Sequence, residues 1–301
     1  MTNIHRWPLA LVLAGAAFVA WRAGATPMSY SDLLARPRPE AVLTRHYGPA
    51  PDQLAELFLP KRAGLLRTIV LIHGGCWLAE IPGAILMDYL AEDLRQRGFA
   101  VWNIDYRRIG ENGGGYPGTF RDVAKAMDTL RAIAPAYKLD LSRLVVIGHS
   151  AGGQLAAWAA ARPHLPQDSV LYESNPLPIS AVVSLAGIDD LADYRDRGPT
   201  ACGGASTIDA LVGPPSGAHK DVYADTSPSR LLPIGVRQVL VSGSLDPIVP
   251  SRFAEAYGAM AKASGDNIEL LTIGGAGHFE LIDPTSDAWK QIEPMIESLE
   301  K

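Results

Sequence analysis

The sequence has few charged residues and no long basic run. Of its 301 residues, 20% are charged, with 27 basic and 32 acidic side chains and a net charge of −5. Binding a nucleic-acid backbone requires clustered Lys and Arg, so this composition argues against a nucleic-acid partner. The 48% of hydrophobic residues argues against intrinsic disorder as the main state. We therefore expect a folded protein that acts on a small molecule.

The sequence also lacks a hydrophobic run of the length that crosses a bilayer. The 15 uncharged residues 7–21 follow Arg6, whereas a membrane span needs about 20. Residues 23–25 then give the A-x-A pattern of a signal cleavage site. We predict that residues 1–25 are a signal peptide, and that the mature chain is periplasmic or secreted and has no stable membrane span. The alternative is an uncleaved N-terminal anchor.

Cysteine is scarce, with only Cys76 and Cys202 in the chain. Export would place both in an oxidising compartment, where disulfides form and persist. We hypothesise a single bridge that links the segment around residue 76 to residues 187–232. Two buried free thiols are the alternative, because the sequence does not give the distance between the two Cα atoms.

Metal-binding and phosphate-binding motifs are absent as well. No H-E-x-x-H or C-x-x-C spacing occurs, and these are common signatures of metal sites. Residues 111–115 end in three glycines but lack the Lys-Ser or Lys-Thr that completes a phosphate loop. We therefore expect neither a metal nor a cofactor.

After an irregular, proline-containing lead-in over residues 26–50, the chain alternates short apolar strands with helical segments. The expected strands are 54–59, 68–72, 99–104, 144–147, 181–185, 239–241 and 268–273, and the expected helices are 83–97, 119–134, 151–162, 251–264 and 286–299. Continuous apolar strands are typical of parallel sheets that are covered on both faces. The pattern predicts one α/β domain over residues 26–301, with a mostly parallel twisted sheet and helices on both faces.

One segment, residues 187–232, interrupts this alternation. It is rich in Gly, Pro and Asp and shows only short helical pieces. Loops of this length inside a domain usually have a function. We interpret it as a short lid-like insertion that shapes the substrate site. A simple surface connection is the alternative.

A candidate nucleophile lies between an expected strand and an expected helix. Gly148-His149-Ser150-Ala151-Gly152 fits G-x-S-x-G and follows the strand 144–147 directly. A serine on such a strand-to-helix turn takes a strained backbone conformation, and small residues two positions away on either side let the strand and helix approach. We predict that Ser150 is exposed at the carboxyl edge of the sheet as a nucleophile.

A serine needs a base to take its proton. His278 is the best candidate, because it follows the last expected strand across a glycine-rich turn. His149 is committed to the serine motif. The remaining histidines of the mature chain, His46, His164 and His219, are expected to be solvated.

The base in turn needs a carboxylate that orients it. Asp246 follows the strand 239–241, and two nearby prolines would stiffen its loop. Asp189 and Asp190 follow the preceding strand and compete for this role. We favour Asp246, because the order Ser, Asp, His then places all three groups after carboxyl ends of one sheet. Asp283 is expected to be a turn residue.

Stabilising a negatively charged oxygen requires backbone donors. His73-Gly74-Gly75-Cys76-Trp77 follows the strand 68–72, and its glycines let the main chain approach a substrate. We predict that the N–H groups of Gly75, Cys76 and Ala151 form an oxyanion hole. Asp105 to Arg108 are expected to hold the loop beneath it by ion pairing.

In these motifs the chain resembles the α/β-hydrolases, in the esterase and lipase branch with the signature H-G-G-x-W followed by G-x-S-A-G-G. The likeness covers residues 42–300 and extends to bacterial carboxylesterases, feruloyl-esterase-like proteins and kynurenine-formamidase-like proteins. It implies a catalytic triad of Ser150, Asp246 and His278, and hydrolysis of a small-molecule ester through an acyl-enzyme intermediate. Formamidase-like members tend to have an aromatic residue or glycine where this chain has Cys76. An arylformamidase or amidase is the alternative enzyme, and a non-catalytic binding protein of the same fold is the alternative of another class.

Overall fold

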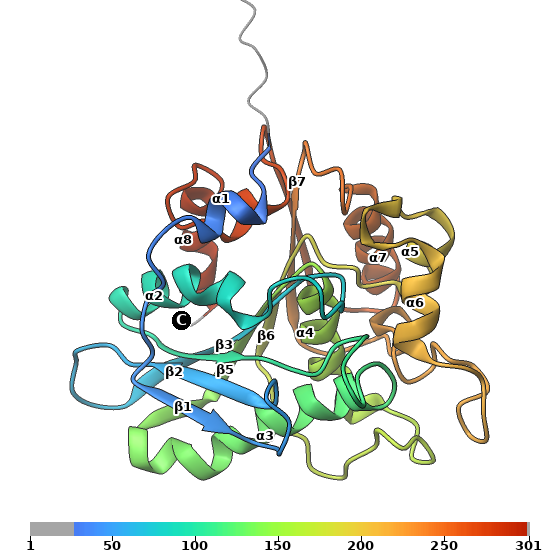
Figure 1. Cartoon of the computed structure of the whole chain (residues 1–301), viewed down its shortest axis with the longest axis horizontal. Helices are drawn as coiled ribbons and strands as arrows, with labels where there is room; N and C mark the ends of the chain where they lie inside the picture. The colour runs from blue at the N-terminus through green and yellow to red at the C-terminus, as the bar shows by residue number, and fades with distance from the viewer. Residues whose placement is uncertain (1–26, 300–301) are drawn as a thin grey trace, which may run out of the picture.

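One twisted sheet runs through the molecule in the computed structural model, which describes residues 27–299 (Figure 1). The predicted signal peptide, residues 1–25, lies outside the described residues. The strands are β1 (Leu43–His46), β2 (Leu54–Phe58), β3 (Leu66–Ile72), β4 (Ala100–Ile104), β5 (Leu139–His149), β6 (Ala181–Leu185), β7 (Arg237–Gly243) and β8 (Ile268–Ile273). Among the described residues, no helix is both long enough and apolar enough to span a membrane.

The sheet has eight strands in the order β1-β2-β4-β3-β5-β6-β7-β8. Strands β3 to β8 pair in parallel, and β1 and β2 join antiparallel at one edge. The predicted mostly parallel sheet is therefore confirmed. The apolar pattern predicts no strand at β1, because its residues LTRH are largely exposed.

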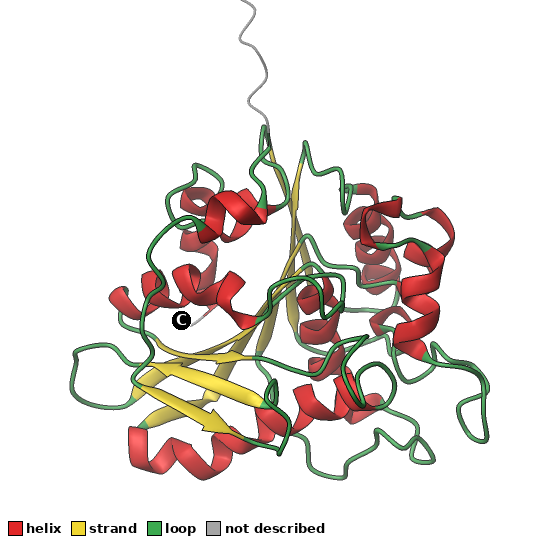
Figure 2. Ribbon diagram, viewed as in Figure 1, coloured by secondary structure: helices red, strands yellow, loops and turns green. Residues whose placement is uncertain are grey.

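Helices cover both faces of the sheet (Figure 2). The α-helices are α1 (Tyr30–Leu34), α2 (Asp88–Gln96), α3 (Gly118–Tyr137), α4 (Ala151–Ala161), α5 (Leu191–Arg197), α6 (Ala205–Val212), α7 (Arg252–Ala263) and α8 (Trp289–Leu299), and the 3-10 turns are η1 (Ala84–Met87), η2 (Arg162–His164), η3 (Thr200–Cys202), η4 (Pro228–Arg230) and η5 (Phe279–Ile282). Helices α2 and α8 lie on one side of the sheet, and α3, α4 and α7 lie on the other (Figure 1).

Helix α4 is the most deeply buried of these helices. All 11 of its residues, AGGQLAAWAAA, are buried. Apart from Gln154, the helix is apolar on every side, which is typical of a helix in the interior, and its small residues let it pack closely against β5 and β6. The residue before α4, Ser150, is therefore held by the core of the protein.

Several helices and strands begin or end at other residues than the sequence predicts. The expected helix 83–97 divides into η1 and α2, and the last helix begins at Trp289. Strand β5 starts five residues earlier than expected, at Leu139 instead of 144. Its first half includes Ser142 and Arg143, which are polar and exposed. The apolar pattern of the sequence therefore does not reveal where the strand begins.

The lead-in before β1 packs against the loop that carries His278. The backbone N–H of Met28 donates to Glu280 Oε1 at 2.6 Å, and the ring of Tyr30 meets that of Phe279 edge-on with 6.0 Å between centroids. The first described residues therefore pack against the loop that carries His278.

The insertion, residues 187–232, carries α5, η3, α6 and η4 and is packed onto the body. Its His219 is buried, with Nε2 donating to the Val212 carbonyl at 2.8 Å and Nδ1 3.0 Å from Asp225 Oδ1. The ring stacks on Tyr116 with 3.7 Å between centroids. The expectation that His219 is solvated is wrong, because the insertion folds around the ring and Tyr116, from a distant part of the chain, stacks on it. His46 and His164 are exposed as expected.

Gly148→Ala is expected to destabilise the fold by at least about 3 kcal/mol. A Cβ on Gly148 would lie 1.9 Å from the Gly152 carbonyl oxygen, and neither backbone can move away. Chemical denaturation followed by circular dichroism measures the effect. Gly274→Ala is the matched control, because a Cβ there meets no described atom within 4 Å, and a shift of less than about 0.5 kcal/mol is expected. Equal losses in both variants would contradict the prediction.

Candidate active site

Ser150 occupies a strained turn between β5 and α4. Its backbone has φ 56° and ψ −119°, a conformation that costs a non-glycine residue about 1–3 kcal/mol. Gly152 packs against the end of β3, where an added Cβ would lie 2.1 Å from the Ile72 carbonyl oxygen. The close packing of small residues therefore forces the turn, as the G-x-S-x-G motif predicts.

His278 and Asp246 come together after β8 and β7. Nδ1 of His278 lies 2.7 Å from Asp246 Oδ2, and both residues are buried. The other oxygen, Asp246 Oδ1, accepts the backbone N–H groups of Ile248 at 2.8 Å and Val249 at 2.9 Å. Because the carboxylate accepts from Nδ1–H, the lone pair of the neutral imidazole lies on Nε2.

The competing carboxylates lie elsewhere. Asp189 is buried and accepts the Ser184 hydroxyl at 2.9 Å. Burial raises the pKa of Asp189 to about 7, with Ser184 opposing the shift and the charge of Asp190 adding to it. Asp190 caps α5 by accepting the N–H of Asp193. Among the described residues, neither forms a hydrogen bond or ion pair with His278.

Asp283 is a turn residue, as expected. It accepts the N–H and the hydroxyl of Thr285, both at 2.9 Å, and pairs with Arg36 at 2.8 Å.

His149 has a structural role that the sequence motifs do not indicate. Its Nε2–H donates to the backbone carbonyl of His278 at 3.1 Å, and the two rings lie 4.4 Å apart. Burial, together with the charge of His278, lowers the pKa of His149 well below its ordinary value, so the ring is neutral. The residue beside Ser150 therefore fixes the backbone that carries His278. The only sequence signal was its place inside the serine motif.

The glycine-rich loop after β3 lies against the serine turn. A Cβ on Gly74 would lie 3.0 Å from the Ser150 Cβ. Within residues 27–299, the backbone N–H groups of Gly75, Cys76 and Ala151 donate no hydrogen bond. Unpaired donors next to a serine are what an oxyanion hole requires.

The base of this loop is held by the segment after β4. His73 Nε2 lies 2.9 Å from Asp105 Oδ1, and its ring stacks on Tyr106 with 4.2 Å between centroids. Arg108 donates to the Ile81 carbonyl at 2.9 Å and pairs with Glu111 at 2.8 Å. The expected ion pairing beneath the loop is confirmed.

The tip of the same loop is linked to the insertion. A disulfide joins Cys76 to Cys202 in η3, which confirms the hypothesised bridge and rules out two free thiols. The next residue, Trp77, donates from Nε1 to Gln154 Oε1 at 3.1 Å. No sequence motif indicates this role for Gln154, which is recognisable only as a residue of α4.

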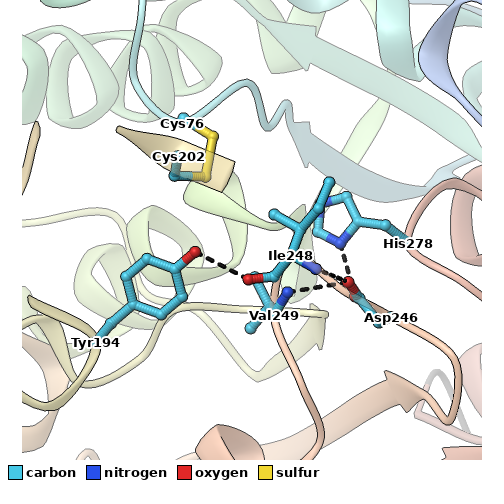
Figure 3. The surroundings of a disulfide bond; sticks show 7 residues. All are labelled: Cys76, Tyr194, Cys202, Asp246, Ile248, Val249 and His278. Carbon is cyan, nitrogen blue, oxygen red and sulfur yellow. Dashed lines mark hydrogen bonds and ion pairs between the residues drawn. A yellow bond between two sulfur atoms is a disulfide. The ribbon is translucent and has the colours of Figure 1, made fainter. Parts of the chain in front are cut away.

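The insertion also contacts the loop of Asp246. The hydroxyl of Tyr194 in α5 donates to the Ile248 carbonyl at 2.9 Å. Figure 3 shows this hydroxyl pointing at Ile248, beside the N–H groups that Asp246 accepts. Tyr194 is a second supporting residue that the sequence motifs did not indicate.

The fold and the site together define an α/β-hydrolase: a mostly parallel sheet, a strained serine turn before a buried helix, and a histidine–aspartate pair after the last two strands. The profile of the BD-FAE family matches residues 55–258. The chain belongs to this family of α/β-hydrolase esterases.

Sequence identity to individual proteins of this kind is low. Esterase LipC of Mycobacterium tuberculosis is 29% identical over 248 residues, which are 79% of this chain and 59% of the relative. The chain thus spans about three fifths of the length of this curated relative.

Solved structures share the fold. Esterase B of Lactobacillus rhamnosis, inhibited by a tributyrin phosphonate, is 19% identical and has a TM-score of 0.73, covering 89% of this chain and 88% of its own. A thermophilic esterase of Thermogutta terrifontis with butyrate bound is 19% identical and has a TM-score of 0.67, covering 85% and 92%.

Asp189→Asn is expected to stabilise the protein more at pH 8 than at pH 5. The pKa of Asp189 is raised from 3.8 to about 7 in the fold. The folded state therefore keeps a proton that the unfolded state has lost, and stability falls as the pH rises from about 4 to about 7. Asn cannot ionise and still offers Ser184 an acceptor. Melting temperatures of both proteins at the two pH values test this, and a difference that does not change with pH would contradict it.

Proposed function

We propose that the protein is a serine hydrolase that cleaves small carboxylic esters through an acyl-enzyme intermediate. The observation that carries the proposal is the buried 2.7 Å hydrogen bond between His278 and Asp246, held beside the strained turn of Ser150 by the bond from His149 to the His278 carbonyl. Membership of the BD-FAE family supports ester chemistry. The tributyrin phosphonate and the butyrate bound by the two solved esterases support short acyl chains.

His278 acts as the general base in this mechanism. Asp246 holds Nδ1–H, so Nε2 accepts the proton of the Ser150 hydroxyl as Oγ attacks the carbonyl carbon of the ester. The imidazolium formed is stabilised by the buried carboxylate. Because Asp246 also accepts two backbone N–H groups, it stays oriented toward the ring throughout.

The carbonyl oxygen becomes negatively charged when the new C–O bond forms. The N–H groups of Gly75, Cys76 and Ala151 donate to this oxygen, and each such donor contributes about 3–4 kcal/mol of transition-state stabilisation. Ala151 is the first residue of α4, so the positive end of the helix dipole adds to the effect.

The intermediate collapses when His278 gives its proton to the leaving alcohol. The acyl group stays on Ser150 Oγ. Water then attacks the acyl carbon with His278 again as base, and the second collapse releases the acid and returns the proton to Ser150.

Ser150→Ala is expected to abolish covalent labelling by a fluorophosphonate and to lower ester turnover at least about 1,000-fold. The nucleophile is lost while the turn keeps a small side chain. Labelling and hydrolysis of p-nitrophenyl esters measure the effect, and circular dichroism checks that the variant is folded. Wild-type protein that is folded but neither labels nor turns over would overturn the proposal. Faster turnover of N-formyl anilides than of esters would instead favour an arylformamidase or amidase.

We further propose that the chain is exported and that residues 1–25 are removed. The apolar segment and the A-x-A pattern support this, and so does the disulfide between Cys76 and Cys202, which suits an oxidising compartment.

Expression of the full chain in a bacterial host is expected to yield a periplasmic or secreted protein whose first residue is Thr26. Mass spectrometry of the purified protein and cell fractionation measure this. Full-length protein in the membrane fraction would show a retained anchor.

A further inference from the structure

Two adjacent residues of the glycine-rich loop have an unusual backbone. Cys76 has φ 53° and Trp77 has φ 57°. Residues with a Cβ disfavour this left-handed region, and such conformations persist only where the surroundings fix them. Both residues are linked to the insertion, residues 187–232, by different chemistry.

The first link is covalent. Cys76 is bonded to Cys202, which lies 126 residues later in η3 and is buried. The preceding helix, α5, is itself fixed to the body, since Tyr194 donates to the Ile248 carbonyl in the loop of Asp246. The disulfide therefore connects the loop to a segment that is already fixed. Figure 3 shows the disulfide and Tyr194 to the left of the pair of Asp246 and His278.

The second link runs through a buried amide. Trp77 Nε1–H donates to Gln154 Oε1 at 3.1 Å, and Gln154 Nε2 donates to the Thr226 carbonyl at 2.8 Å. All three residues have 0% exposure. Gln154 lies four residues after Ser150 on α4, so one side chain joins the glycine-rich loop, the nucleophile helix and the insertion.

We propose that the insertion positions the oxyanion loop, and that Gln154 and the Cys76–Cys202 disulfide are the positioning groups. The inference rests on the proposed serine hydrolase function. An oxyanion hole works when its donors lie about 2.7–3.1 Å from the position of the charged oxygen. Donors on a strained loop drift from that position when the contacts that hold the loop are removed.

This role predicts a specific kinetic signature. The oxyanion forms after the substrate is bound, so loss of its donors affects the transition state and leaves substrate binding nearly unchanged. A link that merely stabilised the fold would lower the fraction of active protein but not the turnover of each active molecule.

The test compares Gln154→Met with the double variant Cys76→Ser and Cys202→Ser. Gln154→Met keeps the size of the side chain and the disulfide, and the double variant keeps Gln154. Arg195→Ala is the matched control within the insertion, because it breaks the exposed 2.6 Å ion pair to Asp209 and touches neither link. Active sites are counted by fluorophosphonate labelling carried to completion.

Gln154→Met and the double cysteine variant are the two link variants. Per active site, each is expected to show a kcat lower by about 10- to 100-fold and a KM within about twofold of the wild type. Affinity for a trifluoromethyl ketone, which forms a tetrahedral oxyanion on the serine, should fall by the same factor as kcat/KM. Arg195→Ala should match the wild type in kcat, in KM and in affinity for the ketone.

A kcat and ketone affinity equal to those of the wild type in both link variants would overturn the proposal, as would a rise in KM with kcat unchanged. If the double variant does not fold, the wild-type protein reduced by a phosphine under native conditions gives the same comparison without a substitution. Wild-type protein that neither labels nor hydrolyses esters would overturn the serine hydrolase itself. Labelling and turnover that survive unchanged in the link variants overturn only the positioning role.

Discussion

The strained turn at Ser150 is the constraint on which the rest of the site depends. It requires that β5 and α4 meet with almost no side chain between them, and Gly148 and Gly152 leave room for nothing larger than hydrogen. Helix α4 is buried along its whole length, so the core holds the turn and offsets its conformational cost. As a consequence, the serine and the N–H of Ala151 are presented together at one edge of the sheet.

Three loops meet at this edge, and each is fixed by contacts from another part of the chain. His73 at the start of the oxyanion loop pairs with Asp105 after β4. The loop of Asp246 is held by its own backbone N–H groups and by Tyr194. The backbone of His278 is held by His149. A site assembled from separate loops stays in place only if such contacts limit the motion of each loop.

The insertion contributes to this arrangement from one side. It supplies Tyr194, Cys202 and the carbonyl of Thr226, and each contacts a different element of the site. It is anchored in turn through Tyr116 of the body, whose hydroxyl donates to Asp225 at 2.9 Å and whose ring stacks on His219. In the structure it is therefore packed against the body through buried polar contacts. Whether it also acts as a lid over substrate stays a prediction.

The sequence by itself determined the alternation of strands and helices, the serine turn and the residues that meet at the sheet edge, because these depend on local periodicity and on short motifs. Only the tertiary structure decided the pairing of strand β1, the burial of His219, and the positioning roles of His149 and Gln154. Gln154, for example, is an ordinary helix residue until Trp77 and Thr226, each more than 70 positions away, lie on either side of it. Contacts between distant segments leave no periodic trace in the chain, so only the fold reveals them.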